Sequence, residues 1–295
     1  MTGADAVWRD YDQVALDAQY NNRARFPNYI EHFKAWGEWS AAARAMLPAH
    51  LDLAFGTAPA EALDVFPAAT GRAAIYVFIH GGYWYSLDKS DYSYIAHGMR
   101  PHGIATAVNN FTLAPAADMD EIVRQNRAAL AFIWRHAGEW GADPDRIYVA
   151  GHSAGGHLAA LLLATDWPAF GDGLPRNLVK GACAIGGIFD LEPIRLSFLN
   201  AKLHLTPNQA ARHSPLRMTC PGAAPLLLIV AKDESNEFHR QSQDMARHWR
   251  DQGKGVELIV PEGLDHFDVV NQLKDPGCEL VRLQLDHMRA ALGLS

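Results

Sequence analysis

The chain alternates between short runs of β-forming residues and longer stretches of helical periodicity, which is typical of a mostly parallel sheet with helices on both faces. Eight runs are predicted strands: 51–55, 62–66, 74–80, 104–109, 146–150, 179–185, 225–231 and 256–260. Helical patterns follow at 119–139, 154–164, 235–252 and 278–292. The first two strands are predicted to pair antiparallel, whereas the later connections are too long for hairpins. The predicted fold class is therefore α/β.

We expect a single domain, because the 295 residues contain no internal repeat and no linker that divides them. Two segments fall outside the alternation. Residues 1–50 form a helical N-terminal segment rich in aromatic residues and arginine, and 187–221 is a helical insertion bounded by prolines. Segments beside the carboxyl ends of strands often cover a pocket. We thus expect residues 51–295 to form the domain, 187–221 a small cap and 1–50 a pocket cover, although simple packing explains either segment equally well.

The charge and composition favour a small-molecule partner. Lys and Arg number 26 against 33 Asp and Glu, giving a formal net charge of −7, and no basic block suggests binding to nucleic acid or anionic membranes. The longest apolar runs, 158–164 and 225–231, are far shorter than the roughly 20 residues of a membrane-spanning helix. The acidic start of the chain lacks the features of a secretory signal, and three scattered cysteines suit a reducing compartment, so we expect a cytoplasmic protein with free thiols at Cys183, Cys220 and Cys278.

The most informative motif is Gly-His-Ser-Ala-Gly at 151–155, between a predicted strand and a predicted helix. A serine at a tight strand-to-helix turn needs small residues two positions away on each side, because the turn presses them against neighbouring backbone. The turn lifts the Ser153 hydroxyl above the sheet and aims the Ala154 N–H at a developing oxyanion. We predict Ser153 as a nucleophile, Ala154 as an oxyanion donor and His152 as a substrate-binding residue; the alternative is a structural turn.

A second motif, His-Gly-Gly-Tyr-Trp at 80–84, directly follows a predicted strand. Glycines allow backbone N–H groups to approach a substrate closely, so Gly81 and Gly82 are predicted oxyanion donors. His80 is interpreted as a structural residue that fixes this loop, because a base must reach Ser153 from the other side. Tyr83 and Trp84 are candidate substrate-binding residues, although aromatic side chains here also suit a core.

A serine nucleophile needs a base, and the base needs an acid that holds its tautomer. Acidic residues follow the strand 225–231, and His266 follows the strand 256–260. Both positions lie at carboxyl ends of strands, where open α/β sheets build their sites. We predict His266 as the base and either Asp233 or Glu234 as the acid, while Asp265 is interpreted as a loop residue.

The motifs HGGYW, GHSAGGHLA, SNEFHRQS and GLDHFDV together resemble the arylformamidase (kynurenine formamidase) branch of the α/β-hydrolases, which is related to hormone-sensitive-lipase-like esterases. The resemblance runs from about residue 51 to the C-terminus. It implies a single α/β-hydrolase domain with Ser153 as nucleophile, His266 as base and the amides at 81, 82 and 154 as oxyanion donors. It also places the family's acidic position at Glu234, where the family more often has aspartate, so Asp233 remains an alternative.

The activity implied by this resemblance is hydrolysis of N-formyl-L-kynurenine to kynurenine and formate. The aryl group is expected to stack on Trp84 or Tyr83, and either Arg23 or Arg25 is a candidate partner of the substrate carboxylate. The alternative function is a carboxylesterase acting on small acyl or aryl esters, because fold and reacting residues do not fix the substrate. A non-catalytic binding protein is a third hypothesis, which the complete set of reacting residues opposes.

Cofactor motifs are not found in the sequence. It lacks a His-Glu-x-x-His pattern and a cysteine pair with zinc spacing, and it has neither a dinucleotide-binding fingerprint nor a Walker lysine. We therefore predict a hydrolase without metal or nucleotide cofactor. The oligomeric state stays open, because an exposed aromatic N-terminal helix could serve a homodimer or a lid.

Overall fold

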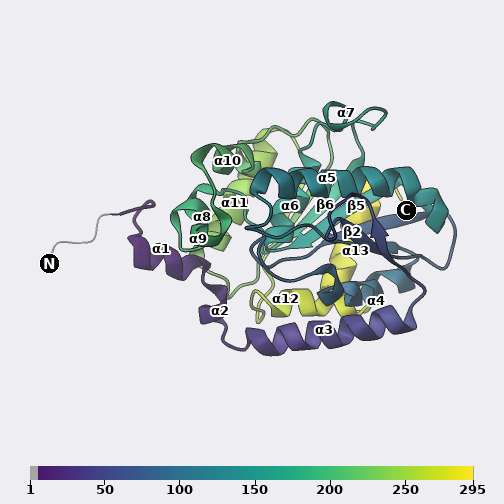
Figure 1. Cartoon of the computed structure of the whole chain (residues 1–295), viewed down its shortest axis with the longest axis horizontal. Coiled ribbons are helices and arrows are strands. Elements are labelled where there is room, and N and C mark those ends of the chain that lie inside the picture. Colours follow the sequence, from purple (N-terminus) through teal and green to yellow (C-terminus); the bar gives the residue numbers. More distant parts are fainter. Residues whose placement is uncertain (1–5, 295) are drawn as a thin grey trace.

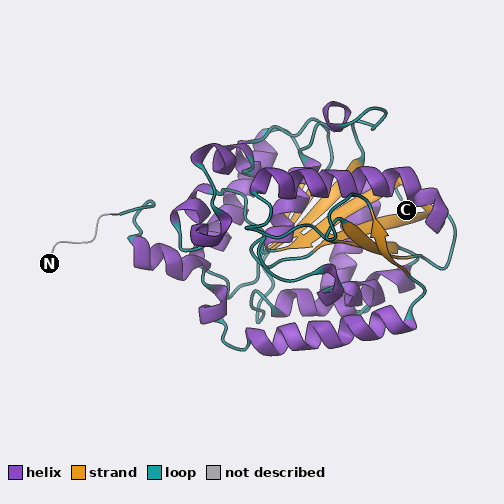
Figure 2. Cartoon of the chain, viewed as in Figure 1, coloured by secondary structure: helices purple, strands orange, loops and turns teal. Residues whose placement is uncertain are grey.

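A computed structural model describes residues 6–294. Its centre is one eight-stranded sheet with strand order β1-β2-β4-β3-β5-β6-β7-β8 (Figure 2). Strand β2 is antiparallel to both of its neighbours, and all pairs from β4 to β8 are parallel. The strands are β1 (His50–Ala54), β2 (Ala62–Phe66), β3 (Ala73–Ile79), β4 (Ala105–Asn109), β5 (Ala142–His152), β6 (Val179–Ile185), β7 (Leu226–Ile229) and β8 (Val256–Ile259).

The sequence prediction of a mostly parallel α/β sheet is confirmed, and all eight predicted strands exist. The largest difference is in β5, which begins at Ala142 rather than at 146. The additional residues pair with the start of β3, where Ala73 lies opposite Ala142 beside an irregularity in register. Strand β7 is shorter than predicted and ends at Ile229, because the chain then turns toward the loop that carries Glu234.

Helices cover both faces of the sheet, which therefore has two hydrophobic cores. Alternation along β3 sends Ile75, Val77 and Ile79 into one core and Tyr76 and Phe78 into the other. The first core is covered by α1 (Gln13–Tyr20), α5 (Met119–His136), α6 (Ala154–Leu163) and α11 (Asn236–Asp251). The second is covered by α3 (Tyr29–Met46), α4 (Ala96–Met99), α12 (Asp268–Asn271) and α13 (Glu279–Leu292). In Figure 1, α5 and α3 lie on opposite sides of the sheet.

The N-terminal segment passes from one face of the sheet to the other. Helix α1 buries Tyr20 in the first core, and the Tyr20 hydroxyl donates to Glu237 of α11 at 2.9 Å. Helix α3 buries Trp36 in the second core, and the Trp36 indole N–H donates to Asn271 at 2.5 Å. The short helix α2 (Asn22–Arg25) connects the two, as Figure 1 shows. The segment thus crosses the rim of the sheet at α2.

The insertion between β6 and β7 forms α8 (Glu192–Leu196), α9 (Asn200–Leu203) and α10 (Pro207–Arg212). These helices lie beside α1 and α11 in Figure 1. The contact with α1 includes Phe198 N–H donating to Asp17 at 2.8 Å and the Gln13 amide donating to the Leu196 carbonyl at 3.0 Å. The remaining short elements are α7 (Trp167–Phe170) and the 3₁₀ turns Lys89–Asp91, Ser93–Ile95, Arg100–His102, Ala137–Trp140, Pro215–Arg217 and Gln272–Lys274.

Among residues 6–294, none of the helices combines the length and apolar composition that crossing a membrane requires.

Candidate active site

Ser153 occupies the single residue between β5 and α6. Its backbone has φ +57° and ψ −115°, a conformation that is unfavourable for a residue with a Cβ, and its N–H donates to the Ile185 carbonyl at 2.7 Å. A Cβ on Gly151 would lie 2.2 Å from the Gly155 oxygen, and a Cβ on Gly155 would lie 2.0 Å from the Ile79 oxygen. Both glycines are therefore required by close backbone contacts, for the reason that the motif suggested.

His266 and Glu234 form a buried pair at the same carboxyl edge of the sheet. His266 Nδ1 lies 2.7 Å from Glu234 Oε2, and the two side chains are only 2% and 1% exposed. The second Glu234 oxygen accepts the Ala231 N–H at 3.0 Å, which fixes the carboxylate. Asp233, the alternative acid, is exposed. Since Nδ1 donates to the carboxylate, His266 Nε2 is left with a lone pair that can accept a proton.

Gly186, which follows β6, packs directly against this pair. It has φ +52°, and a Cβ there would lie 3.0 Å from both His266 Cε1 and Nδ1 and 3.1 Å from Glu234 Oε1. The missing side chain therefore makes room for the histidine and the carboxylate. Gly186 was not among the residues predicted for the site. The signal was present, because the pair Gly186 and Gly187 follows a predicted strand, as Gly81 and Gly82 do.

The loop after β3 lies against Ser153. A Cβ on Gly81 would be 3.3 Å from Ser153 Cβ and 3.0 Å from the His152 oxygen, and Gly82 has φ +102°. His80 is fully buried; its ring contacts the Gly81 oxygen at 2.8 Å and Asn110 Oδ1 at 3.0 Å. These contacts fix the loop, in agreement with the structural role expected for His80.

A small cavity of about 340 Å³, counting its opening to solvent, brings the predicted residues together. It is lined by His152, the last residue of β5, and by residues of the turns and loops that follow strands, namely Ser153, Gly82, Tyr83, His266 and Phe267. Tyr92 and Leu87 close one side. Ser153 and His266 thus line one space, whereas Gly81 and Ala154 are buried and are not among the residues that line it.

The N-terminal segment completes the cavity with Asn22, Arg23, Phe33 and Trp36. Residues of α2 and α3 therefore form part of the cavity lining. None of the lining residues among 6–294 belongs to the insertion 187–221, which packs against α1 and α11 instead. Of the two candidate arginines, Arg23 lines this cavity and Arg25 does not.

The structure corrects the prediction for Trp84. Its indole is fully buried in the first core, donates to His157 Nδ1 at 3.3 Å and does not line the cavity. The neighbouring Tyr83 does line it, and its hydroxyl donates to the Tyr20 carbonyl at 2.6 Å, which ties the loop to α1. Sequence alone could not separate these two rings, because the loop turns sharply with positive φ at both residues.

His152 is held as a neutral imidazole. Burial is the main cause that lowers its pKa well below the usual value, followed by the nearby His266. His152 Nε2 lies 2.7 Å from the His266 carbonyl oxygen, so Nε2 carries the hydrogen. His152 therefore holds the backbone at His266 in place, and its Nδ1 has no partner among the described residues.

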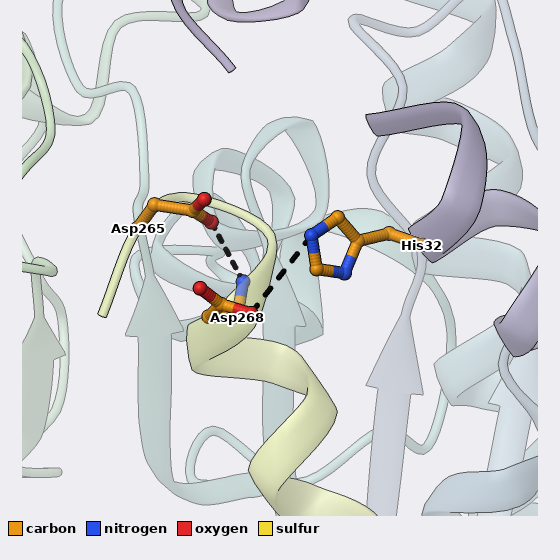
Figure 3. Close-up of side chains that lie close together, drawn as sticks. All are labelled: His32, Asp265 and Asp268. Atoms are coloured by element: carbon orange, nitrogen blue, oxygen red, sulfur yellow. Dashed lines mark hydrogen bonds and ion pairs between the residues drawn. The ribbon is translucent and has the colours of Figure 1, made fainter. Parts of the chain in front are cut away.

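One cluster near the site has donor atoms suited to a cation. The ligand atoms of His32, Asp265 and Asp268 lie within 4.8 Å of one another (Figure 3). Asp265 Oδ1 accepts the N–H groups of Phe267 and Asp268 at 2.7 and 2.8 Å, and His32 is 3.8 Å from Asp268. The His32 ring also contacts Asn271 at 2.9 Å. These groups have partners within the protein, and they fasten the turn after His266 to α3.

The strand order of the sheet is that of the α/β-hydrolases. So is the order of the site residues along the chain, with a serine at the turn after β5 and a histidine after the last strand. The protein is an enzyme of this hydrolase class. Residues 63–248 match the family model BD-FAE, so the chain belongs to the BD-FAE family.

Comparison with known proteins gives a more detailed placement. The chain is 30% identical to the kynurenine formamidase of Danio rerio over 94% of this chain and 97% of that protein. It is also 30% identical to the kynurenine formamidase of Salmo salar over 95% and 98%. A crystal structure of a putative thioesterase from Silicibacter sp. superposes with a TM-score of 0.81 and 28% identity, covering 90% of this chain and 97% of the other. The chain is thus an arylformamidase-like α/β-hydrolase.

Proposed function

We propose that the protein is a serine hydrolase that cleaves aryl formamides, converting N-formyl-L-kynurenine to kynurenine and formate. The observation that carries this proposal is that Ser153 and His266 line one cavity, and that His266 Nδ1 is paired with the buried Glu234 carboxylate. The full-length similarity to kynurenine formamidases supports the choice of a formamide.

In the first step, Ser153 Oγ attacks the formyl carbon while its proton passes to His266 Nε2. The buried Glu234 carboxylate stabilises the imidazolium that forms, because the pair has almost no contact with solvent. The carbonyl oxygen becomes an oxyanion, for which the N–H groups of Gly81, Gly82 and Ala154 are the candidate donors. Ala154 is the first residue of α6, so its N–H has no partner within the helix.

In the second step, the oxyanion collapses and His266 gives its proton to the aniline nitrogen. The C–N bond breaks, kynurenine leaves, and the formyl group remains as an ester of Ser153. Water then attacks the formyl carbon and gives a proton to His266. Formate departs, the proton returns to Ser153 Oγ, and the enzyme is regenerated.

The walls of the cavity suit an aromatic substrate with a small acyl group. Phe33, Trp36, Tyr92 and Phe267 provide four rings around Ser153. Aromatic rings stack favourably on such walls, and a formyl group carries only hydrogen beyond its carbonyl. A longer acyl chain would compete with these rings for the limited space.

A carboxylesterase acting on small acyl or aryl esters is the second candidate. The same three groups hydrolyse esters, and the superposed crystal structure carries the name of a putative thioesterase. The test compares kcat/KM for N-formyl-L-kynurenine and for p-nitrophenyl acetate, with formate measured as a product. Efficient formamide cleavage supports the proposal, whereas rapid ester cleavage with negligible formate release would reject it.

Labelling with an organophosphate tests whether the protein is catalytic at all. We expect one modification, located at Ser153 by peptide mass spectrometry. An unlabelled Ser153 in folded protein would favour a binding protein on a hydrolase scaffold.

A further inference from the structure

The cavity has an unusual charge for a chain whose formal net charge is −7. Among the residues of 6–294 that line it, Arg23 is the only one with a permanent charge, and none is Asp or Glu. Within residues 6–294, no carboxylate oxygen lies within 4.0 Å of the Arg23 guanidinium, although most other arginines near the surface have such a partner. An uncompensated cation therefore stands at the mouth of the reacting site.

Arg23 is positioned without being neutralised. One guanidinium N–H donates to Ser86 Oγ at 3.1 Å, and the guanidinium carbon lies 5.5 Å from the ring centre of Tyr29 and 5.6 Å from that of Phe33. These contacts fix the direction of the side chain, because a guanidinium over aromatic rings is attracted to their faces. An arginine has five N–H donors, so most of its capacity remains available to a ligand.

The residue before Arg23 supplies an independent observation. Asn22 is only 3% exposed, lines the same cavity, and has an amide nitrogen Nδ2 with no hydrogen-bond partner among the described residues. A buried donor without a partner is costly, so Asn22 Nδ2 calls for an acceptor that the described residues do not supply. Asn22 and Arg23 are both donors, so the ligand group that satisfies them is an acceptor with negative charge.

We propose that Arg23 and Asn22 bind the carboxylate of the substrate, a specificity that rests on the proposed function of the site. The aromatic rings hold the aryl group, Ser153 meets the formamide, and the carboxylate lies at the mouth under Arg23. The substrate class is therefore aryl formamides with an anionic group at the end remote from the formamide. A neutral formanilide would contact the same aromatic residues of the cavity but would leave Arg23 and Asn22 without a partner.

Arg25 is a matched control from the same short helix. It has the same charge, is exposed, and does not line the cavity. A general electrostatic attraction of anions would depend on both arginines, whereas a specific carboxylate site depends on Arg23 alone.

The experiment measures ligand binding in the Ser153→Ala variant by calorimetry, so that it does not require turnover. L-Kynurenine carries the carboxylate, and kynuramine is the same molecule without it. We expect L-kynurenine to bind about tenfold more tightly than kynuramine, the size of one partly exposed charge-assisted contact. Adding Arg23→Gln should remove the difference, Arg23→Lys should keep part of it, and Arg25→Gln should leave it unchanged.

Asn22→Leu should reduce the preference about threefold, and circular dichroism will show whether the variants are folded. Equal affinity for the two ligands, undetectable binding of L-kynurenine, or equal effects of Arg23→Gln and Arg25→Gln would each overturn the carboxylate site. The proposed function fails separately, through the absence of formate release by the wild type. If the protein prefers the carboxylate ligand but does not cleave formamides, the carboxylate site at Arg23 and Asn22 stands and the proposed formamide hydrolysis is rejected.

Discussion

Two parts of the molecule meet at the cavity and hold their side chains in different ways. At the carboxyl edge of the sheet, Ser153 and His266 are positioned by the ends of strands and by neighbouring glycines. A side chain at these glycines would collide with nearby atoms. The N-terminal segment is attached by side chains, such as the Tyr20 hydroxyl on Glu237 and the Trp36 indole on Asn271. The edge is therefore suited to the chemical step, and the segment to recognition of the substrate.

This difference predicts that substitutions in the two parts change different kinetic constants. Substitutions at the edge should lower kcat, because they remove groups that we propose act in the transition state. Substitutions in the N-terminal segment should mainly raise KM, because they remove contacts that bind the substrate before and during reaction.

The largest effect is expected for Ser153→Ala. Removing the nucleophile should lower kcat by about 10⁴- to 10⁶-fold for formamides and esters alike. The residual rate is measured with N-formyl-L-kynurenine and p-nitrophenyl acetate at matched protein concentration. Wild-type turnover by a folded alanine variant would place the chemistry elsewhere in the molecule.

The next effect separates the two adjacent acids. Glu234→Ala should lower kcat by about 10²- to 10⁴-fold, because His266 loses the carboxylate that holds its tautomer and stabilises its charged form. Asp233→Ala, the matched control, should change kcat less than twofold, since Asp233 is exposed. A greater loss in the Asp233 variant would reassign the acid.

A third prediction concerns stability and the buried His157 of α6. Burial lowers the pKa of His157 to about 3, so the folded state binds fewer protons than the unfolded state between that value and about 6.5. The free energy of unfolding should therefore decrease as the pH is lowered through this window, by at most about 1.4 kcal/mol for each pH unit. The decrease from pH 6.5 to pH 5 should be about 2 kcal/mol.

Urea unfolding of the wild type and His157→Gln at both pH values measures this contribution. The variant should lose about 2 kcal/mol less between the two pH values than the wild type loses. The other buried histidines should keep part of the dependence in both proteins. Identical losses would show that His157 is not protonated on unfolding.

The smallest effect tests the N-terminal side. Phe33→Ala removes a ring that lines the cavity and lies beneath Arg23. We expect KM for an aryl formamide to rise about tenfold, with kcat within threefold of the wild type. Ile30→Ala is the control, because Ile30 is in the same helix, is 63% exposed and does not line the cavity. If Phe33→Ala lowers kcat and leaves KM unchanged, the assignment of substrate binding to the N-terminal segment is wrong.

Much of the fold could be predicted because local patterns determine it. Buried parallel strands are nearly continuous apolar runs, and all eight strands, the antiparallel β1 and β2 included, were predicted within a few residues of their observed ends. The turn at Ser153 was predictable from its glycines, since only residues without a side chain fit so close to backbone. The positions of Glu234 and His266 followed from the rule that sites form at carboxyl ends of strands.

The lining of the cavity was less predictable. Trp84 and Tyr83 are adjacent and both aromatic, yet one enters the core and the other lines the cavity. The insertion 187–221 and the N-terminal segment were both expected beside the site, and only the latter supplies lining residues among 6–294. Gly186 and Asn22 were not singled out, because their roles depend on neighbours far away in the sequence.

The sequence by itself determined the sheet, the order along the chain of the residues proposed to react and the places where glycine is indispensable. These features arise from periodicity and from steric limits on a few consecutive residues, which a linear pattern records. Only the tertiary structure decided that Glu234 rather than Asp233 meets His266, that α2 closes the cavity, and that Arg23 faces it while Arg25 does not. Those choices depend on how separate elements pack in space, and residues one or two positions apart can then point to different environments.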